Sequence, residues 1–122
     1  MKHLVTLLAL SFLSPAMSAQ DPDCAGRDRF PAFAAYSALT QSFGIPGESL
    51  DKAKTTTRRI SSQKIGKDLY LQVHLVNFMT KTGTSTSAIV VNEVSSQECS
   101  VSAEDVYLIS NKLTSYTDTK RH

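Results

Sequence analysis

Residues 68–79 constrain the fold more than any other stretch of the sequence. Alternate positions carry Leu69, Leu71, Val73 and Leu75, and this period-two repeat of aliphatic side chains is typical of a strand with one apolar face. We therefore expect the odd-numbered face to pack inside a sheet core. The other face is amphipathic and is formed by Tyr70, Gln72, His74, Val76 and Phe78.

The N-terminus has the three-part layout of a secretory signal peptide. A short positive start at Lys2 precedes an apolar run at residues 4–13, and Pro15 and small residues follow. The run is shorter than the roughly twenty residues that a membrane-spanning helix needs. A buried N-terminal helix is the alternative, which the order of the regions disfavours. We expect residues 1–19 to be a signal peptide and the protein to be periplasmic, without a membrane span.

The remaining chain, roughly 100 residues long, is the size of one domain. We expect a single domain over residues 20–113 and a flexible C-terminal tail over residues 114–122, which is polar and without periodicity. The whole sequence has 13 Lys and Arg residues and 11 Asp and Glu residues. Because this balance is close to neutral, it argues against nucleic-acid binding, which needs a concentrated basic surface.

Two cysteines, Cys24 and Cys99, allow one disulfide. An even number of cysteines in an exported chain usually forms bridges, and this bridge would tie the N-terminal segment to the far end of the chain. A redox or nucleophilic cysteine is the alternative. It is disfavoured because the sequence has no Cys-x-x-Cys pair and Cys24 lies among acidic residues that raise a thiol pKa.

The other elements follow from periodicity and from turn residues. A helix is expected from residue 28 or 31 to residue 43, with an aromatic stripe of Phe33, Tyr36 and Phe43 in the core and Gly44 as its left-handed end. An edge strand is expected over residues 55–65, joined to residues 68–79 by a type II′ turn at Gly66. A central strand is expected over residues 84–94.

Residues 105–113 are ambiguous. Residue types such as Val106 and Ile109 favour a strand over residues 105–111, whereas Ser102 and Asp105 form a capping-box-like start that would suit a helix. We favour the strand. The predicted fold class is therefore α+β: an N-terminal helix packed on a three- or four-stranded antiparallel meander. In general layout it resembles cystatin-like and NTF2-like domains.

No set of catalytic residues can be recognised. His74 is the only histidine inside the expected domain, and its neighbours on the same face are not metal ligands, so a structural histidine is favoured over a metal or triad residue. The sequence also has no Gly-x-Ser-x-Gly motif, no His-Glu-x-x-His motif and no phosphate-binding glycine loop. We therefore expect no enzyme activity, no metal site and no cofactor.

A binding protein remains as the expected class. The candidate contact surface is the even face of residues 68–79, on the side of the sheet away from the helix, because Tyr, Phe and Arg often dominate interface energies. The alternative is that this face is simply core. A second candidate contact is the loop at residues 80–84. The candidate partner-binding residues are Tyr70, Gln72, His74, Phe78, Arg58, Arg59, Lys81 and Thr82.

The short leader, the size and the single disulfide are similar to those of exported immunity proteins and periplasmic hydrolase inhibitors of bacteria. The resemblance implies one-to-one binding of a secreted toxin or an envelope hydrolase, often through an inserted loop. Two other functions stay open. One is a small-ligand carrier with an internal pocket near Phe33, Tyr36 and Phe43, and the other is an accessory structural subunit of an envelope complex.

Overall fold

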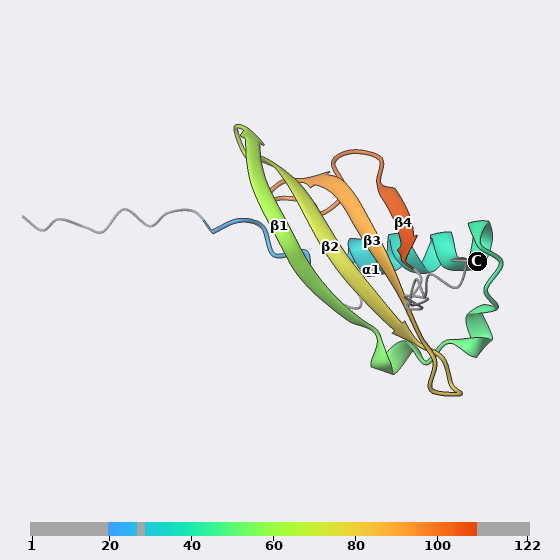
Figure 1. Cartoon of the computed structure of the whole chain (residues 1–122). Coiled ribbons are helices and arrows are strands. Elements are labelled where there is room, and N and C mark those ends of the chain that lie inside the picture. The colour runs from blue at the N-terminus through green and yellow to red at the C-terminus, as the bar shows by residue number, and fades with distance from the viewer. Residues whose placement is uncertain (1–19, 27–28, 110–122) are drawn as a thin grey trace, which may run out of the picture.

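The computed structural model describes residues 20–26 and 29–109, which form one antiparallel sheet, one α-helix and three short helical segments of other types (Figure 1). The strands are β1 (Thr56–Gly66), β2 (Leu69–Met79), β3 (Ser85–Val94) and β4 (Asp105–Ile109), and they lie in the order of the sequence. The predicted α+β meander is therefore confirmed, with β1 at an edge and β3 in the interior. The signal peptide and the C-terminal tail predicted above lie outside the described residues.

Helix α1 (Phe30–Ser37) begins with Pro31 in its first turn, where the missing N–H of proline is tolerated. The sequence predicts a helix that ends at residue 43. In the structure, α1 continues into η1 (Ala38–Ser42), which has the wider turn of a π-helix. In that turn the N–H of Phe43 donates to the carbonyl of Ala38 at 3.1 Å. The chain then leaves the helix at Gly44, whose φ of 67° confirms the predicted left-handed end.

The face that α1 turns to the sheet is made of small side chains, so the predicted aromatic stripe is wrong for Phe33 and Phe43, whereas Tyr36 is half-buried and packs against the core. Phe33 is 64% exposed and Phe43 is also exposed. Small side chains let the helix approach the sheet closely, because the side chains at a contact set the distance between packed elements. The buried residues of α1 are Pro31, Ala32, Ala34 and Ala35, and Leu39 of η1 continues the buried surface.

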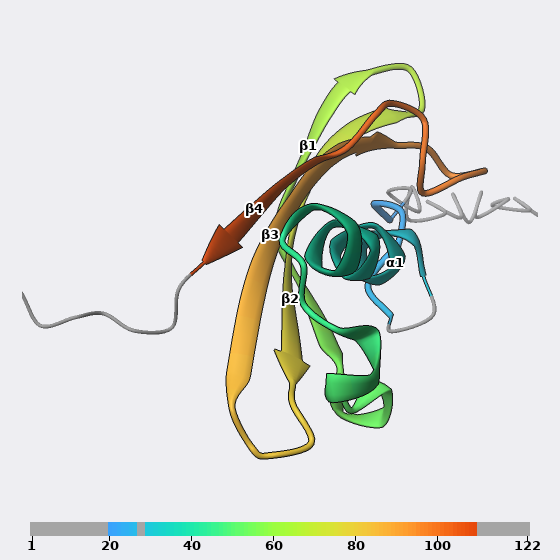
Figure 2. The ribbon, with the colours of Figure 1, turned by 90° about the vertical axis from the view of Figure 1, so that its right-hand side faces the viewer.

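Helix α1 packs on the even-numbered face of β2, which reverses the predicted orientation of this strand. Val76 and Phe78 lie in the core beneath the helix, together with Ala88 and Val90 of β3. The aliphatic odd-numbered positions of β2 are only half-buried and face the other side of the sheet. Figure 2 shows that α1, residues 20–26 and the short helices η2 (Gly47–Ser49) and η3 (Lys52–Lys54) all lie on one side.

The last strand and the first turn of the sheet can be compared with the sequence-based expectation. The strand prediction for residues 105–109 is confirmed, whereas residues 110–113 lie outside the described part of the chain. The predicted antiparallel hairpin of β1 and β2 is confirmed, but its turn is at Lys67 and Asp68, because Gly66 still pairs with Leu69. Asp68 has a φ of 50°, a left-handed conformation that aspartate adopts more readily than most residues.

The disulfide between Cys24 and Cys99 is present, as predicted, and joins residues 75 positions apart. It fixes the N-terminal segment to the loop between β3 and β4. The buried Cys24 packs with Tyr70 and Val94 in a second, smaller apolar cluster. Among the described residues, no helix is long and apolar enough to cross a membrane.

Candidate functional site

Four of the predicted contact residues are buried on the helix side of the sheet. Tyr70 and Phe78 are almost fully buried, and Gln72 and His74 have no exposed surface. The prediction that these side chains form an exposed docking face opposite the helix is therefore wrong. The alternative interpretation, that these four side chains belong to the core, is correct.

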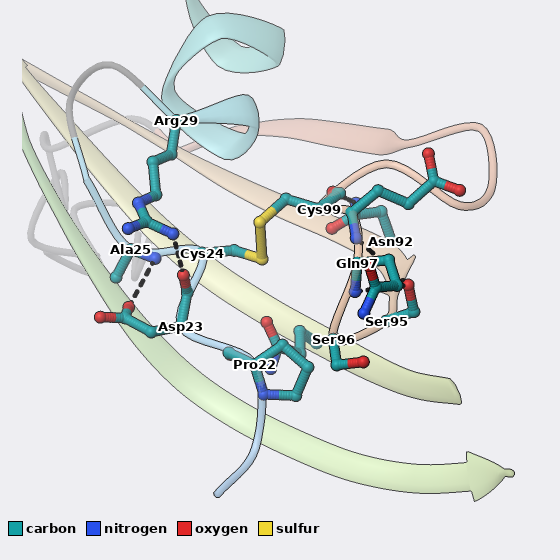
Figure 3. Close-up of a disulfide and its surroundings, with 12 residues drawn as sticks. Pro22, Asp23, Cys24, Ala25, Arg29, Asn92, Ser95, Ser96, Gln97 and Cys99 are labelled. Carbon is teal, nitrogen blue, oxygen red and sulfur yellow. Dashed lines mark hydrogen bonds between the residues drawn. A yellow bond between two sulfur atoms is a disulfide. The ribbon is translucent and has the colours of Figure 1, made fainter. Parts of the chain in front are cut away.

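Gln72 and Asn92 hold the two segments that the disulfide joins. They are direct neighbours on β2 and β3, and both are buried. The amide nitrogen of Gln72 donates to the carbonyl of Pro22 at 2.8 Å, and that of Asn92 donates to the carbonyl of Cys99 at 2.7 Å. Figure 3 shows Asn92 and Pro22 close to the bridge. These polar residues on a core face thus have a structural role.

His74 lies beside this pair with neither ring nitrogen hydrogen-bonded. Burial lowers the pKa of His74, because a low-dielectric environment disfavours the imidazolium form. The positive charge of Arg59 lowers this pKa further, and the negative charge of Asp23 opposes the shift. His74 is therefore a neutral core residue. Within residues 20–26 and 29–109, no three His, Cys, Asp or Glu side chains form a group that could hold a metal ion.

The two predicted arginines are exposed but point to opposite sides of the sheet. Arg59 pairs with His74 on the helix side, and its guanidinium donates to the carbonyl of Pro22 at 3.1 Å. Arg58 pairs with Leu75 on the open side. The structure therefore separates these neighbours in sequence, because successive side chains of a strand alternate between faces.

Residues 80–84, here called the tip loop, project from the end of the β2–β3 hairpin, and both predicted contacts Lys81 and Thr82 are exposed. The loop is internally bonded. The N–H of Thr80 donates to the carbonyl of Thr84 at 2.7 Å, and the N–H of Gly83 donates to the carbonyl of Thr80 at 3.0 Å. The hydroxyl of Thr80 accepts from the N–H of Thr84 at 2.9 Å.

The tip loop is also braced from outside the hairpin. The N–H of Lys81 donates to the carbonyl of Ser49 at 2.9 Å, and Leu50 forms an isolated bridge with Thr80. Leu50 is itself part of the main core cluster. The backbone of the loop is therefore fixed to the core before any partner binds. The side chains of Lys81 and Thr82 are exposed, and the Thr82 hydroxyl shares a hydrogen bond of 3.0 Å with the Thr80 hydroxyl.

Sequence reasoning predicts a contact surface on the side of the sheet away from the helix, but it assigns the wrong residues of β2 to that side. Its centre is a contiguous apolar area, here called the open-face patch, on neighbouring strands β2, β3 and β4. Tyr107 is 58% exposed and the other members are half-buried. The aliphatic repeat of β2 was the available signal, but it was read as core. The patch comprises Leu71, Val73, Leu75, Ile89, Val91 and Tyr107.

A groove of about 570 Å³ lies between α1, η3 and the end of β2. It is open to solvent, so it is not the internal pocket that a ligand carrier predicted, and Phe43 does not line it. The ammonium group of Lys52 lies 4.7 Å from the centroid of the Tyr36 ring at the groove. The lining residues are Ala32, Phe33, Tyr36, Lys52, Ala53, Thr55 and Phe78.

Comparison of the chain with models of protein families, with curated proteins and with solved structures gives no match.

Proposed function

We propose that this chain is an exported protein-binding domain of the periplasm, and that it is an immunity protein or inhibitor. It neutralises a cell-envelope toxin or hydrolase by one-to-one binding. The observation that carries the proposal is the tip loop, which is exposed, rigidly hydrogen-bonded and anchored to the core through Leu50 and Ser49.

A preformed loop favours tight inhibition because little conformational entropy is lost when it binds. Lys81 at the tip supplies a positive charge for an acidic cleft. The exposed Thr82 hydroxyl shares one hydrogen bond with Thr80 and can form a further one with a partner. Hydrolases that use carboxylates as acid and base present such acidic clefts. The signal-peptide pattern at residues 1–19 and the disulfide both suit a protein that works outside the cytoplasm.

The test is inhibition by the purified chain of the secreted toxin or hydrolase encoded next to it. We expect inhibition to be complete at one chain per target. Lys81→Glu should weaken binding at least tenfold in a calorimetric titration, because it reverses the charge at the centre of the contact. The measured quantities are the dissociation constant and the stoichiometry.

Lys64→Glu is the matched control, because Lys64 is an exposed lysine on β1 rather than on the tip loop. This variant should bind within about twofold of the unchanged chain, as expected for a charge outside the contact. Equal loss of affinity in both variants would assign the effect to overall charge and not to the loop. Absence of any one-to-one complex would reject the proposed function.

The groove beside α1 favours a second candidate function, transport of a small anionic amphiphile. Its apolar wall includes Phe33 and Tyr36, Lys52 adds one positive charge, and its volume is typical of ligand sites. Mass spectrometry of a solvent extract of the purified chain tests this function. A chain without any bound lipid or aromatic acid, which also fails to bind an anionic fluorescent probe, would reject it.

A further inference from the structure

The open-face patch needs a cover that the described residues do not provide. All other described elements lie on the α1 side of the sheet (Figures 1 and 2). Cross-strand pairs make the patch continuous: Leu75 lies beside Ile89, and Ile89 lies beside Tyr107. Monomeric proteins rarely expose contiguous apolar areas of this kind, and a polar rim around one marks an interaction surface.

The rim of the patch carries opposite charges at its two edges. The β1 edge has Arg58 directly beside Leu75, and the β4 edge has Asp105 directly beside Val91. Both charged side chains are exposed. Across the sheet, one row therefore runs from a cation through two aliphatic side chains to an aromatic ring: Arg58, Leu75, Ile89 and Tyr107.

We propose that the cover is a second copy of this chain, packed face to face through the open-face patch around a two-fold axis parallel to the strands. Such a rotation places β1 of each copy over β4 of the other. Arg58 then meets Tyr107 and Asp105 of the partner copy at both edges, which combines a cation–π contact with an ion pair. Two-fold dimers use the same surface on both copies in this way.

The charges select this arrangement over the other face-to-face dimer. A two-fold axis perpendicular to the strands, within the plane of the interface, would place β1 over β1 and β4 over β4. Arg58 of both copies would then share one edge and Asp105 of both copies would share the other, which brings like charges together at both edges. In the selected arrangement the strands of the two sheets run in nearly the same direction, as in aligned sheet packing.

The size of the face predicts a dimer of moderate strength. The four strands have 11, 11, 10 and 5 residues. At a spacing of about 4.8 Å and roughly 3.3 Å per residue they give a face of roughly 600 Å². Two such faces bury roughly 1,200 Å², close to the lower limit for a specific interface. We therefore expect dissociation in the range of about 1–100 μM. Both tip loops lie at the same end of the dimer and stay uncovered. The dimer therefore presents two target-binding loops.

Sedimentation equilibrium of the oxidised chain, without any target, tests the dimer separately from the proposed function. We expect the weight-average mass to rise from one to two chains as the concentration increases through that range. Leu75→Asp should give a monomer with an unchanged circular dichroism spectrum. Lys81→Glu, on the tip loop, should dimerise normally. A chain that stays monomeric at about 200 μM would overturn the proposal. The patch would then be covered by another protein or by another segment of the chain.

Exchange of the edge charges tests the direction of the axis. Arg58→Asp alone and Asp105→Arg alone should each weaken the dimer at least tenfold, because each places like charges together. The double variant should restore the dissociation constant to within about threefold. Both residues are exposed, so these variants should keep the fold. A double variant that is no stronger than the single variants would overturn the proposed arrangement.

Discussion

At the scale of single residues, the polar side chains on the core face of β2 divide into satisfied and unsatisfied groups. Gln72 donates to Pro22 and to the hydroxyl of Ser62, whereas its carbonyl oxygen has no partner. Both ring nitrogens of His74 are buried without partners. A buried polar atom without a hydrogen bond costs about 1–3 kcal/mol, so His74 is a position where the fold gives up stability.

His74→Leu should therefore be neutral or stabilising at pH 7.5 and should change the pH dependence of stability. Because the pKa of folded His74 is lowered, the unfolded chain binds a proton below about pH 6.5 that the folded chain does not bind. Stability of the unchanged protein should thus be full above that pH and fall as the pH drops towards the lowered pKa. Urea unfolding between pH 7.5 and 5 measures this loss.

The difference between the unchanged chain and His74→Leu isolates this residue, because the other titrating groups are common to both. The gap in unfolding free energy should widen in favour of the variant as the pH falls from 6.5. A constant gap over this range would show that His74 is protonated in the folded protein as easily as in the unfolded chain.

At the scale of elements, β2 is the strand on which both faces of the sheet depend. Its even positions Val76 and Phe78 pack under α1, and its odd positions form the centre of the open-face patch. Residues on the two faces should therefore respond differently to the same substitution.

Val76→Asp should abolish folding, because it places an unpaired charge at a fully buried position in the core. Val73→Asp should leave a folded chain that loses about 1 kcal/mol or less, since this side chain is half-exposed on the open face. Thermal melts at about 1 μM protein, followed by circular dichroism, distinguish the two. Unfolding of Val73→Asp at this concentration would contradict the assignment of the faces.

At the scale of the whole molecule, the disulfide fixes residues 20–26 across the sheet to the β3–β4 loop. A loop of 75 residues closed by a bridge stabilises the folded state by about 4 kcal/mol in the chain-entropy model. Removing both sulfur atoms with Cys24→Ser and Cys99→Ser should lower the unfolding free energy by about this amount. Denaturant unfolding of the oxidised chain and the double variant measures the difference; equal midpoints would contradict it.

The candidate site was only partly predictable. Lys81 and Thr82 were expected in an exposed hairpin loop, and the structure places them there because Gly83 and polar neighbours favour a turn. The brace from Ser49 to Lys81 could not be foreseen, since it joins segments that are far apart in the sequence. Tyr70, Gln72, His74 and Phe78 were placed on the wrong side, because their own strand does not show where the helix lies.

Local sequence patterns were enough to predict the α+β class, the positions of the strands, the end of the helix at Gly44 and the only possible disulfide pairing. These features depend on period-two repeats, turn residues and two cysteines, all of which are local or unique. The packed fold was needed to show which face of β2 meets α1, and that α1 packs through alanines and not through Phe33. The physical reason is that alternation separates the two faces of a strand, whereas contacts between distant segments select the face that is covered.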